Sequence, residues 1–166
     1  MSYRTRSSDL DWYTAGMIET IFDKIIRREI PSYIVWEDDK HLAFLTPFPN
    51  TPGFTVVIPK INPGDYVFGI DATVYDDLMK ATKTVAKLLE KALEVSRVAL
   101  VFEGTGVAHV HAKLIPLHGG LASQADVWSK HTSFSENYEG FLTTAEGPMM
   151  DEARLKAIQA QIVSAS

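Results

Sequence analysis

Apolar residues near the start of the chain recur at the three- and four-residue spacing of an amphipathic helix. They are Ile18, Ile21, Phe22, Ile25 and Ile26. The pattern predicts a helix from about Asp11 to Ile30. Pro31 is expected to end this helix, because proline disfavours helical geometry in the residue before it.

Three runs of β-branched and aromatic residues follow and predict strands. Residues 33–36 and 42–45 flank the polar turn 37–40, which is typical of an antiparallel hairpin. A connector rich in proline, 46–53, leads to a third run at 54–58 that stops at Pro59. This third run is short and apolar, so we expect a central strand.

The second half of the chain predicts two more helices and two more strands. Asp71 is a good N-cap for a long helix to about Val95, whose apolar stripe is Val74, Leu78, Ala81, Val85, Leu88 and Ala92. Strands are expected at 98–102 and 109–115, and a last helix from about Asp151 to Val163. Between them, 118–148 is rich in Gly, Ser and Asn but carries aromatic residues, so we expect an ordered loop.

These elements predict an α+β fold. Five strands would form one antiparallel sheet, with the long helix and the N-terminal helix packed on one side of it. The length of 166 residues suits a single domain, 1–166, in which 119–166 is a C-terminal extension.

Composition narrows the possible functions. The chain has no cysteine, which excludes disulfides and thiolate nucleophiles and favours a cytoplasmic location. No run reaches the roughly 18 to 20 apolar residues of a membrane helix, so no membrane association is expected. The net charge is −5, from 21 acidic and 16 basic residues, which disfavours long nucleic acids as partners. A small anionic ligand remains possible, because it needs only a local cluster of donors.

Candidate chemistry lies on the strand predicted at 109–115. Side chains alternate along a strand, so His109, His111 and Lys113 would share one face at a spacing of roughly 7 Å. The preceding loop contains Gly104, Thr105 and Gly106. Glycine allows backbone N–H groups to converge on an anion, so this loop is a candidate phosphate site.

Other interpretations of these histidines stay open at this point. Both could be solvated or hydrogen-bonded residues without a role. With His118 they could instead supply three imidazoles to a metal, although the ammonium of Lys113 would repel the cation. His118 is followed by two glycines, so it could alternatively fold back toward the phosphate as a further donor, or be a solvated loop residue. A serine hydrolase is disfavoured, because the chain has no Gly-x-Ser-x-Gly motif.

The segment 106–116 resembles the signature of the histidine-triad (HIT) family, in which histidines alternate with apolar residues before Leu-Ile-Pro. Further segments are similar to the opening helix of that family (20–32), its first hairpin (37–44) and its third strand (52–60). Together these matches cover about 17–118 in the right order.

This resemblance implies an activity and a site. His111 would be the nucleophile that attacks the α-phosphorus of a nucleotide, and His109 would orient it. The substrate would be a dinucleoside polyphosphate or a nucleoside phosphoramidate, and the protein a homodimer that joins two sheets through the long helix and an edge strand. The resemblance places a nucleoside pocket at Ile21, Phe22, Ile25, Phe44 and Thr46.

The chain departs from the family pattern at several of these positions. Lys113 replaces the third motif histidine, and Phe54 replaces a histidine of the third strand. Thr46 replaces the acid that binds ribose, and Thr105 a glutamine before the motif. These changes favour, as an alternative, a nucleotide-binding protein with little or no catalytic activity.

The cysteines of zinc-binding relatives are also replaced, here by Thr20 and Asp23. Neither residue offers the soft thiolate that zinc prefers. We therefore expect no metal and no other cofactor.

Overall fold

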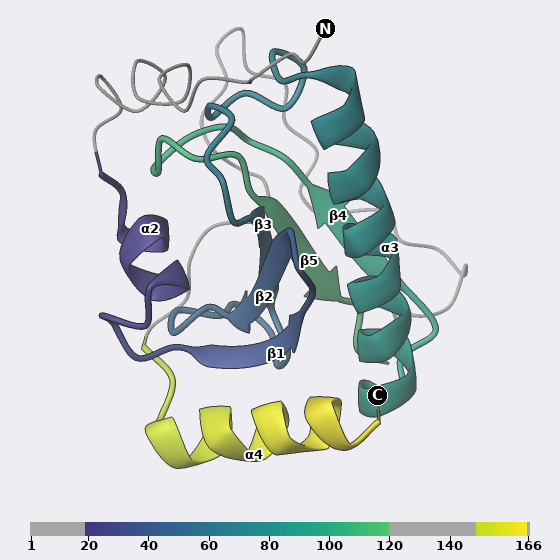
Figure 1. Cartoon of the computed structure of the whole chain (residues 1–166). Coiled ribbons are helices and arrows are strands. Elements are labelled where there is room, and N and C mark those ends of the chain that lie inside the picture. The colour runs from purple at the N-terminus through teal and green to yellow at the C-terminus, as the bar shows by residue number, and fades with distance from the viewer. Residues whose placement is uncertain (1–18, 120–148, 166) are drawn as a thin grey trace, which may run out of the picture.

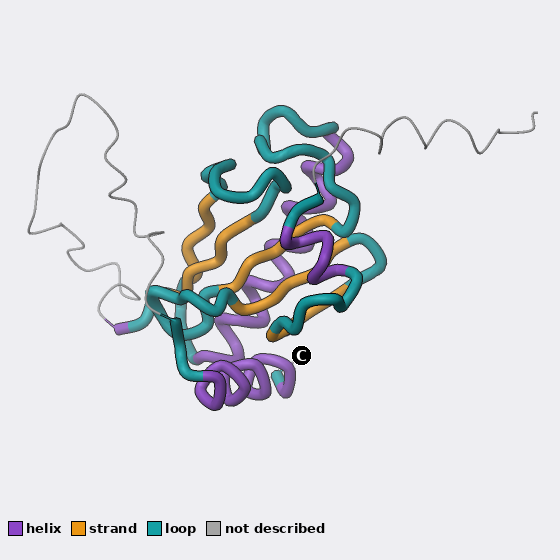
Figure 2. The backbone as a smooth tube through the Cα atoms, turned by 90° about the vertical axis from the view of Figure 1, so that its left-hand side faces the viewer, coloured by secondary structure: helices purple, strands orange, loops and turns teal. Residues whose placement is uncertain are grey.

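The computed structural model describes residues 19–119 and 149–165. Among these residues, five strands form one antiparallel sheet in the order β1-β2-β3-β5-β4. Figure 2 shows the strands of this sheet in orange. They are Tyr33–Glu37 (β1), His41–Leu45 (β2), Thr55–Pro59 (β3), Val98–Val101 (β4) and Ala112–Pro116 (β5). The α+β class and the central position of the third strand are confirmed. Most of the loop expected at 118–148 lies outside the described residues.

Three helices are described: Ile21–Ile26 (α2), Ala72–Leu93 (α3) and Glu152–Ser164 (α4). The predicted starts of α3 and α4 are confirmed by their caps. The Asp71 carboxylate accepts a hydrogen bond from the backbone N–H of Thr73 at 2.8 Å, and Asp151 accepts one from Arg154 at 3.2 Å. These bonds satisfy N–H groups that have no partner within a helix.

The end predicted for the first helix is wrong. Helix α2 stops at Ile26 rather than at Ile30, so Pro31 is not what ends it. Arg28 has a left-handed backbone with φ of 62°, and its N–H bonds to the carbonyl of Ile25. This turn closes the helix in the manner of a glycine-ended helix, but no glycine marks the position.

The sequence predicted that the helices lie on one side of the sheet. They lie on both sides instead (Figure 1). Alternation along each strand supplies apolar side chains to both faces. On the α3 side the larger core includes Ala43, Leu45, Val57, Ala112 and Leu114 with Leu78, Val85 and Leu89. On the α2 side the smaller core consists of Phe22, Ile25, Leu42, Phe44, Val56 and Ile58.

Helix α4 packs beside the edge strand β1 and against α3 (Figure 1). The side-chain amide of Gln159 donates to the carbonyl of Ile34 in β1 at 2.7 Å, and that of Gln161 donates to the carbonyl of Ala92 at the end of α3 at 2.6 Å. Its buried residues Leu155, Ile158 and Ile162 belong to the larger core. No helix in the described part of the chain is long and apolar enough to span a membrane.

Candidate functional site

The two motif histidines precede strand β5 rather than lying within it. The strand was predicted from residue 109, but its ladder begins at Ala112, which pairs with Val57 of β3. The backbone N–H of Val110 bonds instead to the carbonyl of Gly64 at 2.6 Å. The backbone of Val110 is therefore held by the loop after β3 and not by the ladder of a neighbouring strand.

The predicted alternation of faces nevertheless holds. Val110, Ala112 and Leu114 are buried in the core beneath α3. His111 and Lys113 line a cavity on the opposite face. Residues 109–113 thus present one apolar and one polar side, as expected from a half-buried strand.

His111 is oriented by a backbone hydrogen bond. Its Nδ1 lies 2.8 Å from the carbonyl oxygen of His109. A carbonyl oxygen only accepts, so Nδ1 carries the proton and Nε2 keeps the lone pair. Burial lowers the pKa of His111, and the positive charge of Lys113 lowers it further. The imidazole is consequently neutral near pH 7, with one free ring nitrogen.

His109 is fully buried, with 0% exposure, and does not line the cavity. Its Nε2 donates to the carbonyl of Pro59 at 2.8 Å. Among the described residues, its Nδ1 has no hydrogen-bond partner, and it lies 4.0 Å from Oδ1 of Asp23. His111 is also only 5% exposed, so of the two states considered for this pair, solvated or hydrogen-bonded, the structure shows the hydrogen-bonded one.

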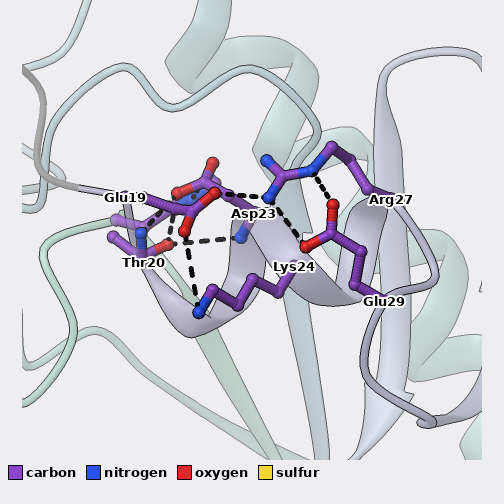
Figure 3. Close-up of polar contacts among 7 residues, drawn as sticks. Glu19, Thr20, Asp23, Lys24, Arg27 and Glu29 are labelled. Atoms are coloured by element: carbon purple, nitrogen blue, oxygen red, sulfur yellow. Dashed lines mark hydrogen bonds and ion pairs between the residues drawn. The ribbon is translucent and has the colours of Figure 1, made fainter.

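Helix α2 forms a wall against both imidazoles. The ring of Phe22 lies edge-on to His109 and His111, with centroids 5.7 and 5.4 Å away. The helix has only six residues, and its start is held by a capping box. Thr20 and Asp23 bond reciprocally there, as Figure 3 shows together with surface ion pairs among the charged side chains of the helix and its flanks. The two positions where zinc-binding relatives carry cysteine thus stabilise the helix that supports the site.

A cavity of about 590 Å³ lies between α2 and the sheet. All five residues predicted for a nucleoside pocket line it: Ile21, Phe22, Ile25, Phe44 and Thr46. Thr105, Gly106, His111 and Lys113 line it as well. The site residues from three distant parts of the sequence are therefore brought together.

Two predicted phosphate-binding residues do not line this cavity. Gly104 has a φ of 68° and packs near Tyr66, so it shapes the loop without reaching the cavity. His118 follows the far end of β5, and its Nε2 lies 3.0 Å from the carbonyl oxygen of Pro52. The strand between His111 and His118 has five residues, which span on the order of 16 Å. The three histidines are not gathered as a metal site would require, and no such cluster occurs in the described ranges.

The sequence did not single out Glu103. Its carboxylate forms an ion pair with the ammonium of Lys113 at the wall of the cavity, where both residues contribute to the lining. Val101, two residues before Glu103, pairs with Lys113 across β4 and β5. The signal in the sequence was an acidic residue directly before the glycine loop. That signal does not indicate that Glu103 lies beside Lys113, which depends on how β4 pairs with β5. Phe54, noted as a replaced histidine, also lines the cavity.

We expect the folded protein to lose stability as the pH falls below about 6.5. The pKa values of His109 and His111 are lowered from 6.5 in the folded state by burial. Below pH 6.5 the unfolded chain therefore binds more protons than the folded chain does. The free energy of unfolding has its full value above pH 6.5 and decreases as the pH falls. Urea unfolding at pH 7.5 and 5.0 measures this dependence. The double variant His109→Gln, His111→Asn should weaken it, whereas His118→Gln should retain it. Equal pH dependence in all three proteins would contradict the assignment.

Comparison with known proteins identifies the family. A model of the HIT domain matches residues 27–120. An uncharacterised HIT-like protein of Borreliella burgdorferi is 34% identical over 107 residues, covering 60% of this chain and 76% of that protein. The adenylylsulfatase HINT1 of Arabidopsis thaliana is 35% identical over 102 residues, covering 58% and 69%.

A solved structure agrees with these matches. The Hit-like protein of Bartonella henselae, described as involved in cell-cycle regulation and solved with an unknown ligand, has a TM-score of 0.65 and 27% identity. The match covers 89% of this chain and 96% of that one. The matched range contains the cavity-lining β-strands and both motif histidines, and the chain therefore belongs to the HIT domain family.

Proposed function

We propose that this protein is a nucleotide hydrolase that transfers a nucleoside monophosphate to His111 and then to water. The observation that carries this proposal is the hydrogen bond from Nδ1 of His111 to the carbonyl of His109. It leaves Nε2 as the nucleophilic nitrogen of a side chain that lines a 590 Å³ cavity. A neutral imidazole attacks phosphorus well and is a good leaving group in the following step.

The reaction has two balanced steps. In the first, Nε2 of His111 forms a bond to the α-phosphorus while the bond from phosphorus to the leaving group breaks, and the leaving group takes a proton from solvent water. In the second, the oxygen of a water molecule bonds to the phosphorus and the P–N bond to His111 breaks. The proton that this water loses passes to solvent, and the nucleoside monophosphate is released. During both steps the carbonyl of His109 stabilises the positive charge that develops on the imidazole, because it accepts from Nδ1.

The lining of the cavity divides into an apolar and a polar part. Ile21, Phe22, Ile25 and Phe44 offer a flat apolar surface for a nucleoside, and Thr46 offers a hydroxyl. Thr105, Gly106 and Lys113 line the same cavity as His111, and we assign them to the phosphate. Gly104 and His118 are outside the cavity and are not included in this phosphate site. The name of the Arabidopsis relative, an adenylylsulfatase, favours adenylate as the transferred group.

The alternative is a nucleotide-binding protein with little or no catalysis. It is favoured by Lys113, which stands where the family has its third histidine and is engaged by Glu103. A rapid-quench experiment with enzyme in excess over substrate distinguishes the two. Using adenine and guanine substrates, turnover with an acid-labile nucleotidyl-protein intermediate supports hydrolysis. Binding of AMP or GMP without turnover of any substrate supports the alternative.

We also propose a homodimer that joins two sheets through β4. This strand is an edge of the sheet, and Leu100 within it is 39% exposed. Most of the apolar stripe of α3, however, is buried in the core of its own chain. Sedimentation at micromolar concentration is expected to give twice the monomer mass of 18.5 kDa. The variant Leu100→Lys should shift the protein toward monomer, and a wild-type monomer would refute the dimer.

A further inference from the structure

Lys113 places a positive charge in an apolar stretch of the sheet. It pairs with Val56 of β3 and with Val101 of β4, and directly opposed residues of an antiparallel sheet put their side chains on the same face. The side chain of Lys113 is only 15% exposed, and it forms an ion pair with Glu103, which is 20% exposed. A charge so shielded from water is costly without a partner, so Lys113 depends on Glu103.

Lys113 also lies close to the proposed nucleophile. It follows His111 by two residues, and both side chains line the same cavity. Successive side chains on one face of an extended chain are roughly 7 Å apart. Among the described residues that line the cavity, Lys113 and Glu103 are the ones with a formal charge. The balance between these two charges therefore sets the electrostatic environment of His111.

We propose that Glu103 is a positioning residue for the reaction, which acts through Lys113 and allows His111 to take on positive charge. This inference rests on the proposed function and adds to it a residue that the sequence did not single out. Glu103 has this effect without touching the substrate, because it neutralises the ammonium beside the nucleophile.

The proposed reaction puts a positive charge on His111. When Nε2 bonds to phosphorus, the imidazole keeps on Nδ1 the proton that it donates to the carbonyl of His109, so the ring becomes cationic. An unpaired ammonium on Lys113 would repel this ring. At an effective dielectric constant of about 20, the repulsion between two unit charges roughly 7 Å apart slows such a step about tenfold or more.

Glu103 offsets this repulsion. Its carboxylate is paired with the ammonium, so His111 faces two charges that sum to zero. Both charges act on the imidazole: burial lowers the pKa of His111 and the bond to His109 raises it, while Lys113 lowers it and Glu103 raises it. Asp23 of α2 acts on the pKa of His109 instead. The ion pair thus carries the same net charge as a neutral histidine at position 113 would.

The first test measures the chemical step by rapid quench, with enzyme in excess and at concentrations that saturate binding of adenosine 5′-phosphoramidate. Diadenosine triphosphate is the second substrate. We expect Glu103→Gln to transfer adenylate to His111 about tenfold or more slowly than the wild type. Its affinity for AMP, measured by calorimetry, should not weaken, because Lys113 keeps its charge.

The matched control is Glu152→Gln, which breaks an exposed ion pair with Lys156 on α4 and should keep the wild-type rate. An unchanged or faster transfer rate in Glu103→Gln would overturn the role of Glu103 while leaving hydrolysis intact. Turnover of neither substrate by the wild type would instead overturn the proposed hydrolase.

The second test needs no turnover. In the ligand-free protein, NMR titration of the imidazole nitrogens of His111 should give a lower pKa in Glu103→Gln and a higher pKa in Lys113→Met than in the wild type. The double variant should return the pKa toward the wild-type value. Should Glu103→Gln fail to fold, the comparison of Lys113→Met with the double variant isolates the effect of Glu103. The same pKa of His111 in these proteins would overturn the inference.

Discussion

Replacing His111 with alanine is expected to lower single-turnover rates by about a thousandfold or more, because the variant has no nucleophile to form the nucleotidyl intermediate. Binding of AMP should change little, since the proposed nucleoside surface lies on α2 and β2 and the proposed phosphate donors remain. Rapid quench measures the rate, and calorimetry measures the affinity.

The matched control for this prediction is His118→Ala. His118 lies outside the cavity and bonds to the carbonyl of Pro52, so turnover and AMP affinity should match the wild type. A loss of turnover in this variant would return His118 to the phosphate site. Persistent turnover in His111→Ala would exclude covalent catalysis through that residue.

Phe22→Ala is expected to lower the free energy of unfolding by about 3 kcal/mol and to weaken AMP binding at least about tenfold. Phe22 is 8% exposed and touches the rings of Phe44, His109 and His111. A six-residue helix with two buried side chains has little else to hold it on the sheet. Urea unfolding and calorimetry give the two quantities.

Ile21→Ala provides the comparison on the same helix. Ile21 lines the cavity but is 51% exposed, so its truncation should change the free energy of unfolding by less than about 1 kcal/mol. Similar stability losses in both variants would mean that α2 is held as a unit by its ends rather than by the ring of Phe22.

Local signals explain which elements could be predicted from sequence. Helix α3 was predicted correctly because its N-cap, Asp71, and its apolar periodicity are both local features of the sequence. The end of α2 was missed because Arg28 adopts a left-handed backbone without being glycine. The apolar residue Ile30 continues the helical spacing beyond the true end, so the pattern alone could not reveal the turn.

The candidate site was predictable where it depends on alternation and not where it depends on register. The spacing of His111 and Lys113 places both on one face in any extended segment. The ion pair with Glu103 instead requires the alignment of β4 with β5 across a long connection, which no local pattern fixes. The start of the β5 ladder at Ala112 rather than at residue 109 could not be predicted for the same reason, because Val110 bonds to the loop after β3.

The packing of α4 beside β1 limits how large an assembly can grow. A sheet extended through β4 of two chains would end in a β1 strand on each side. At both ends the carbonyl of Ile34 already accepts a bond from Gln159, and a helix stands beside the strand where another chain would add. In the proposed dimer, the C-terminal helix would therefore block the addition of a further strand at both ends, so that association would stop at two copies instead of continuing into a fibre.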